Sequence, residues 1–161
     1  GYRCDSPSDL QDLYLRSRTE GFGEEVKRRI LIGTFTLSAA SYDQYFMKAQ
    51  QVRRLIAEEY QSVLEDVDVI AGPSAPNTAF VLNDDSKSIT DMYMEDVFTI
   101  GANLAGLPAI SVPAGMINGL PVGMQLIGSR FGEARLLNIA HQFQRRTDWH
   151  SLTPNLEGLT G

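Results

Sequence analysis

Several features are scarce in this sequence, and each scarcity excludes a class of protein. Cys4 is the one cysteine, so no internal disulfide can form, and a secreted fold held by disulfides is excluded. No apolar run approaches the roughly 18 residues of a membrane-spanning helix, and no charged-then-apolar leader opens the sequence. We therefore expect a cytoplasmic protein without a membrane partner.

Basic charge is also in short supply. Asp and Glu number 20 against 14 Lys and Arg, which gives a net charge of -6. Because nucleic-acid affinity comes largely from clustered Lys and Arg, this chain is not expected to bind nucleic acid directly. The two histidines, His141 and His150, belong to no Cys/His cluster with metal-ligand spacing, and no glycine-rich phosphate loop enters a helix. The sequence thus predicts no metal site and no nucleotide site.

The most informative feature that is present is a pair of Gly-Leu-Pro tripeptides, each followed by a short apolar run. Gly106 can end a helix in a left-handed conformation, and Pro108 cannot continue one. The runs 109–112 and 122–127, together with 67–71, do not alternate between apolar and polar residues. This pattern predicts strands buried on both faces of a helix-covered sheet, rather than a small surface hairpin.

Helices are expected around these strands. The last one should turn Ala134, Leu137, Ala140 and Phe143 inward, and the polar segment 83–88 should be a surface loop. The order of elements predicts an α/β fold with a mixed β-sheet sandwiched between helices. The expected helices cover residues 6–18 (capped by Ser8 or Asp9), 24–37, 41–65, 91–105 and 132–146.

The expected sheet is narrow for a complete domain. Three strands leave open edges, which invite pairing with another chain or with missing parts of the same one. The sequence also begins at Gly1 rather than at a methionine. We expect residues 1–161 to be the C-terminal segment of a single larger domain whose catalytic N-terminal part is absent; a complete small domain is the alternative.

An ordered set of motifs carries a family resemblance. The motifs occupy residues 20–30 (Glu-Gly-Phe-Gly-Glu-Glu-Val-Lys-Arg-Arg-Ile), 33–38 (Gly-Thr-Phe-Thr-Leu-Ser), 42–46 (Tyr-Asp-Gln-Tyr-Phe), 49–53 (Ala-Gln-Gln-Val-Arg), 68–76 (Asp-Val-Ile-Ala-Gly-Pro-Ser-Ala-Pro) and 103–113 (Asn-Leu-Ala-Gly-Leu-Pro-Ala-Ile-Ser-Val-Pro). The set resembles the C-terminal part of the amidase-signature family. The first motif favours the tRNA-dependent amidotransferase subunits within that family, because a general amidase would share only the Gly-Leu-Pro blocks.

The resemblance implies an activity that this chain cannot perform alone. The family hydrolyses amides with a Ser-cisSer-Lys arrangement, but this sequence has no adjacent serine pair, and Lys27, Lys48 and Lys87 lack the family's context. Catalytic residues are therefore expected to lie elsewhere. The resemblance implies that the full enzyme releases ammonia from glutamine, and that a heterotrimer with two other subunits converts Glu-tRNA(Gln) to Gln-tRNA(Gln), or Asp-tRNA(Asn) to Asn-tRNA(Asn). The assembled complex would use ATP and Mg and would bind the misacylated tRNA; no cofactor is expected in this segment.

Two residues are candidates for binding glutamine. Its α-carboxylate suits a fork-shaped cation, and its α-ammonium suits an anion. Arg29 precedes an apolar run that could draw its guanidinium inward, and Asp96 lies at helical spacing with Thr99 and Asn103. By resemblance, Arg29 and Asp96 fall where the tRNA-dependent enzyme holds its glutamine, and Arg28 is the competitor to Arg29.

Two other functions stay open from the sequence. One is membership in a general amidase that acts on a small amide. The other is a non-catalytic module that keeps the scaffold without the nucleophile and binds a partner through its exposed sheet edge.

Overall fold

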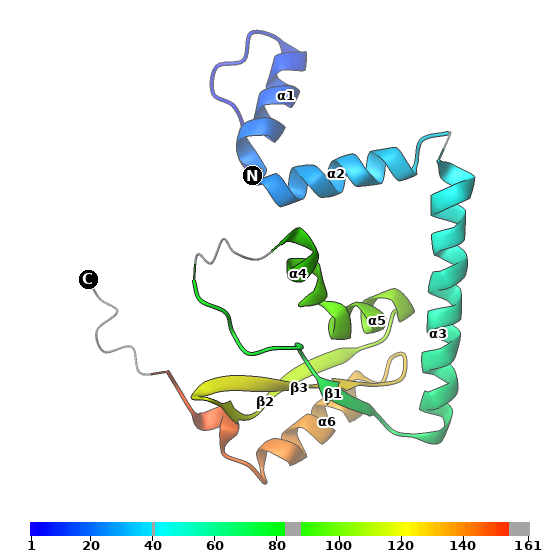
Figure 1. The fold of residues 1–161 in the computed structure, drawn as a ribbon, viewed down its shortest axis with the longest axis vertical. Helices are drawn as coiled ribbons and strands as arrows, with labels where there is room; N and C mark the ends of the chain where they lie inside the picture. The colour runs from blue at the N-terminus through cyan, green and yellow to red at the C-terminus, as the bar shows by residue number, and fades with distance from the viewer. Residues whose placement is uncertain (40, 83–87, 155–161) are drawn as a thin grey trace. The chain divides into compact units, whose positions relative to one another are not determined.

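The computed structural model describes residues 1–39, 41–82 and 88–154, which lie in two compact units, Gly1–Val52 and Arg53–Gly161. The expected loop at 83–88 falls outside the described residues except for Ser88. No helix of the described part is both long and apolar enough to cross a membrane. The elements are α1 (Leu10–Gly21), α2 (Glu24–Thr36), the π-helix η1 (Tyr42–Met47), α3 (Lys48–Asp66), β1 (Ile70–Pro73), α4 (Ile89–Met94), α5 (Val97–Ala105), β2 (Ala109–Ile117), β3 (Leu120–Ile127), α6 (Glu133–Gln144) and the 3₁₀ turn η2 (Trp149–Ser151) (Figure 1).

The first unit is helical, and local signals fix where its helices begin. The Asp9 carboxylate accepts a hydrogen bond from the Asp12 backbone N–H at 2.8 Å and caps α1, one of the two caps expected. The helix continues to Gly21, beyond its expected end. Helix α2 begins at Glu24 as predicted, with two glutamates in its first turn complementing the helix dipole.

Two long helices expected from the sequence are each divided. Residues 41–65 form the π-helix η1 followed by α3, and in η1 the rings of Tyr42 and Phe46 stack with centroids 4.9 Å apart. Residues 91–105 fall into α4 and α5, which are separated at Glu95 and Asp96. Gly106 ends α5 with φ 67, as predicted for a left-handed cap.

The three described strands form a sheet in the order β1-β3-β2, and both pairings are antiparallel rather than those of the expected mixed sheet. The expectation that the two Gly-Leu-Pro strands do not form a hairpin is wrong. They are joined by Asn118 and Gly119 at φ 51 and 80, the left-handed pair that a two-residue hairpin turn needs. Strand β1 is also displaced from the expected 67–71, and it includes Pro73, which pairs with Met124 at the strand end.

Helices cover both faces of this sheet, so the predicted α/β class is confirmed. On one face, Val112 and Leu126 form a buried cluster with Leu136 and Ala140 of α6. On the other face, Gln125 contacts α5. The expectation that every strand is buried on both faces is wrong for β1 and β2, where exposed residues recur between covered ones.

The buried face of α6 differs from the expected one in the first half of the helix. Leu136 is 3% exposed and Leu137 is 58% exposed, and Ala134 is also exposed. Ala140 is buried and Phe143 half-buried, as predicted. Two adjacent leucines fit an apolar stripe equally well, so the sequence pattern alone could not place the face.

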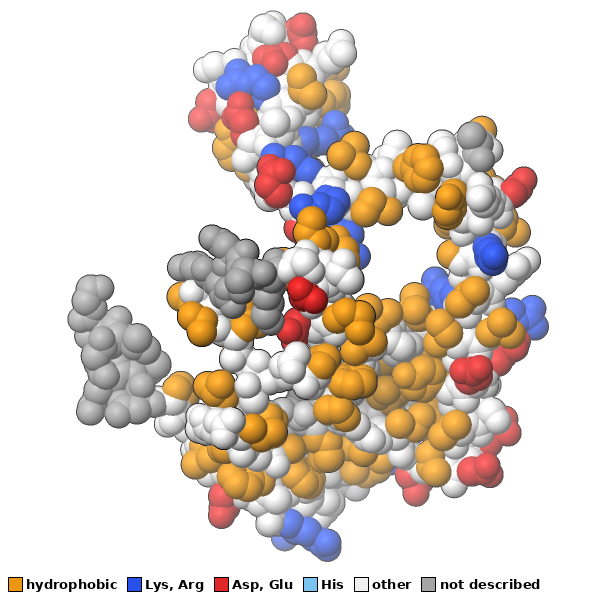
Figure 2. Space-filling model, viewed as in Figure 1, with side chains coloured by type: hydrophobic (Ala, Val, Ile, Leu, Met, Phe, Trp, Pro, Cys, Tyr) orange, Lys and Arg blue, Asp and Glu red, His pale blue; other side chains and the backbone are white. Residues whose placement is uncertain are grey.

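Large hydrophobic side chains remain on the surface of both units (Figure 2). In the first unit, Leu31 of α2 is 71% exposed, and in the second, Leu55 of α3 is 58% exposed. Among the described residues, no large side chain is less than 2% exposed. The core is therefore small and is centred on the sheet and α6.

The two leucines of α6 provide a test of this packing. Leu136→Ala should lower the free energy of unfolding of the 161-residue chain by about 2–4 kcal/mol, because it leaves a cavity in the buried cluster. Leu137→Ala, the matched control, should change it by about 0.5 kcal/mol or less, as is usual for surface sites. Urea denaturation followed by circular dichroism measures both. Equal losses, or a larger loss for Leu137→Ala, would contradict the observed face.

Candidate functional site

Arg29 lies on α2 in the first unit, on the surface rather than in the interior. Its side chain is 62% exposed, so the expectation that the apolar run draws the guanidinium inward is wrong. Arg29 Nε contacts Glu25 Oε1 at 2.9 Å, and Arg28 Nη1 contacts Glu25 Oε2 at 2.6 Å. One carboxylate therefore fixes both arginines one helical turn away, and an exposed guanidinium can meet a ligand carboxylate.

The start of α2 carries a third ion pair. Lys27 Nζ donates a hydrogen bond to Glu24 Oε1 at 2.8 Å, and this bond lowers the pKa of the Glu24 carboxyl below its ordinary value. The ionised carboxylate lies in the first turn, where the helix dipole favours negative charge. The first turn of α2 is therefore acidic, and Arg28 and Arg29 lie in the next turn of the same helix.

Asp96 lies in the second unit at the N-cap of α5. Its backbone carbonyl accepts hydrogen bonds from the N–H groups of Thr99 and Ile100 at 3.0 and 3.2 Å, but its side chain makes no capping bond. The side chain is exposed at a helix N-terminus, and the Thr99 hydroxyl donates a hydrogen bond to the Asp96 backbone carbonyl at 3.0 Å. A carboxylate that is not used as a cap can bind a ligand cation.

Two hydrogen bonds fix α5, and with it Asp96, on the sheet. The buried Gln125 donates from Nε2 to the carbonyl of Phe98, in the first turn of α5, at 2.8 Å. Arg130 donates from Nη2 to the carbonyl of Ala105, the last residue of α5, at 3.2 Å. Sequence reasoning misses both donors, since an isolated Gln or Arg carries no signal of its distant partner.

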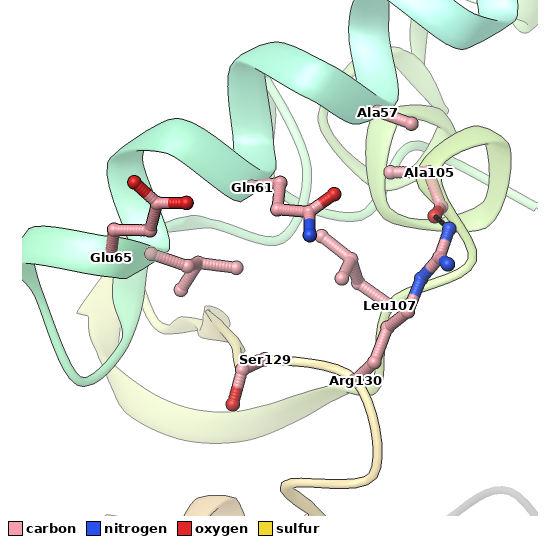
Figure 3. Close-up of a pocket in the computed structure, with 8 residues that line it drawn as sticks. Ala57, Gln61, Glu65, Ala105, Leu107, Ser129 and Arg130 are labelled. Carbon is pink, nitrogen blue, oxygen red and sulfur yellow. Dashed lines mark hydrogen bonds between the residues drawn. The ribbon is translucent and has the colours of Figure 1, made fainter.

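A pocket of about 290 Å³ lies where the second half of α3 faces the end of α5 (Figure 3). Glu65 and Arg130 stand at opposite ends of it, and Arg130 is turned toward the carbonyl of Ala105. Neither Arg29 nor Asp96 lines this pocket, whose volume is at the lower limit for small-molecule sites. Its lining residues are Ala57, Gln61, Leu64, Glu65, Ala105, Leu107, Ser129 and Arg130.

The described part of the chain contains no group of three His, Cys, Asp or Glu residues that could hold a metal ion. His141 and His150 are both exposed, one on α6 and one in η2. Arg29 and Asp96 belong to different units, and their joint role in one glutamine site stays a prediction.

Comparison with known proteins identifies relatives of this chain. The protein family described as Amidase matches residues 2–137. The A subunit of the glutamyl-tRNA(Gln) amidotransferase of Methylococcus capsulatus is 59% identical over 154 residues, which cover 96% of this chain and 32% of that protein. Its counterpart in Coxiella burnetii is also 59% identical, over 97% of this chain and 32% of the relative. The chain thus spans about a third of the length of these relatives.

Solved structures show the same kinship. The crystal structure of the A subunit of the glutamyl-tRNA(Gln) amidotransferase from Thermotoga maritima is 53% identical, with a TM-score of 0.59 over 81% of this chain and 28% of that one. A bacterial aryl acylamidase of the amidase-signature family is 23% identical, with a TM-score of 0.65 over 86% of this chain and 29% of that one. The second likeness concerns the fold alone.

Proposed function

The chain belongs to the amidase family, and we propose that it forms the C-terminal segment of the single amidase domain of a tRNA-dependent amidotransferase subunit that hydrolyses glutamine. The observation that supports this most is 59% identity to the A subunit of a glutamyl-tRNA(Gln) amidotransferase across 96% of the chain. The full enzyme releases ammonia from glutamine. With two partner subunits, ATP and Mg, it converts misacylated Glu-tRNA(Gln) or Asp-tRNA(Asn) to the amidated product.

Within this function, the chain contributes substrate binding. Arg29, with its exposed guanidinium, binds the α-carboxylate of glutamine, and Asp96, whose carboxylate does not cap its helix, binds the α-ammonium. Holding both charged groups fixes the direction in which the side-chain carboxamide points. The serine that attacks this carboxamide, and the second serine and the lysine that relay its proton, are supplied by the rest of the domain.

The first prediction from this function concerns activity. The 161-residue chain alone should release no ammonia from glutamine, because it lacks the residues that form an acyl-enzyme. A chimera in which this chain replaces the matching segment of the Methylococcus capsulatus protein, produced with that organism's partner subunits, should release it. Ammonia is measured with a coupled glutamate dehydrogenase assay. An inactive but folded chimera would overturn the proposed function, as would activity of the chain alone that a substitution within it abolishes.

The second prediction concerns Arg29. In the chimera, Arg29→Ala should lower kcat/KM for glutamine by about 30- to 900-fold, which corresponds to about 2–4 kcal/mol for losing one partner of a desolvated charge pair. Arg28→Ala is the matched control, because both arginines contact Glu25, and it should change kcat/KM by less than about threefold. A loss with Arg28→Ala and none with Arg29→Ala would transfer the role to Arg28.

The third prediction concerns Asp96. Asp96→Asn should lower kcat/KM for glutamine to a similar degree, because the amide cannot neutralise the α-ammonium. Its Tm should stay close to that of the parent chimera, since the Asp96 side chain does not cap α5. The adjacent Glu95→Gln serves as the control and should retain activity. Wild-type kcat/KM in Asp96→Asn would remove this residue from the site.

A further inference from the structure

Two serines meet across the middle strand of the sheet. Ser74 follows the end of β1 and Ser111 lies on β2, and their Oγ atoms are 2.6 Å apart. Strand β3 runs between β1 and β2, and strands two positions apart are about 9–10 Å from each other. Short side chains can span that distance only over a residue without a side chain.

Gly123 of β3 is that residue. A Cβ atom built there would lie 2.7 Å from Ser111 Oγ and 2.9 Å from Ser74 Oγ, closer than real Cβ atoms come to other atoms. The backbone N–H of Ser74 also donates to the carbonyl of Gly123 at 3.0 Å. The glycine inside the second apolar run of the sequence therefore makes room for a pair of hydroxyls.

The hydroxyl pair is suited to binding a polar ligand. When one serine donates to the other, one O–H hydrogen and several oxygen lone pairs are left for a third group. Ser111 is exposed and Ser74 is half-buried, so such a group can reach them. A polar pair of this kind contributes nothing to the apolar core, which lies on the opposite face of the sheet around Leu126.

The position of α5 brings Asp96 toward this pair of serines. Residues Ile127, Gln125 and Gly123 follow one another along the same face of β3, since side chains alternate along a strand. Arg130, which follows Ile127 in the chain, holds the last residue of α5 by a hydrogen bond. Gln125 holds the first turn of α5 by another. The N-terminal end of α5, which carries Asp96, is therefore directed toward Gly123 and the two serines above it.

We propose that the Ser74–Ser111 pair binds the α-ammonium of the glutamine whose charge Asp96 neutralises. An ammonium group has three N–H donors, more than one carboxylate oxygen can accept, and the serine oxygens take the remaining hydrogen bonds. This inference rests on the proposed function and adds to it two substrate-binding residues that carry no charge. It also gives a reason for glycine at position 123.

The test compares two substrates of the chimera described above. Ser111→Ala and Ser74→Ala should each raise KM for glutamine about tenfold, with kcat within about twofold, because they remove binding that substrate and transition state share. Glutaramate, which is glutamine without its α-amino group, should be used equally by the parent and by both variants. Ser62→Ala, at an exposed serine of α3, is the matched control and should leave both substrates unaffected.

The outcomes separate this inference from the proposed function. A parent chimera that folds but releases no ammonia overturns the proposed function and the serine site with it. An active parent with unchanged KM in both serine variants overturns only the serine site. An equal loss for glutamine and glutaramate, or a loss that follows a fall in Tm, would show that the pair supports the fold rather than the ammonium group.

Discussion

Strand β3 is the element on which the second unit depends, because it pairs with both other described strands and its two faces carry different chemistry. Toward α6 it presents Leu126, which is buried with Val112 and Leu136. Toward α5 it presents Gln125, whose amide holds the first turn of that helix. A shift of one residue in register would exchange the two faces and would separate α5 from the sheet. The position of Asp96 is therefore a consequence of how β3 pairs.

The parts of the fold that can be predicted are those set by local chemistry. Asp9, Glu24 and Gly106 mark helix ends because caps and the helix dipole act within one turn. The dipeptide Asn118-Gly119 is typical of a two-residue hairpin turn. The two Gly-Leu-Pro blocks nevertheless favour the wrong interpretation, in which each block starts a separate buried strand. The break between α4 and α5 could not be predicted, because no glycine or proline lies between the two helices.

The candidate site is less accessible to sequence reasoning. Arg29 and Asp96 are candidates through family resemblance, and their individual patterns fit surface charges as well. The apolar run after Arg29 even predicts the wrong environment, since the guanidinium is exposed. The Ser74–Ser111 contact depends on the order of three strands and on their register, and neither can be read from residues 37 positions apart.

Much apolar surface of this chain is exposed. A chain of this length that folds as one complete domain usually buries roughly 68–70% of its unfolded surface around a single core. Here the buried hydrophobic side chains are few, and Leu31 and Leu55 remain largely exposed in their units. The chain matches only 32% of the length of its relative, and exposed apolar surface of this kind is typical of contact sites. On the sheet, the face toward α5 extends past the first turn of that helix to Gly123, where the hydroxyls of Ser74 and Ser111 meet.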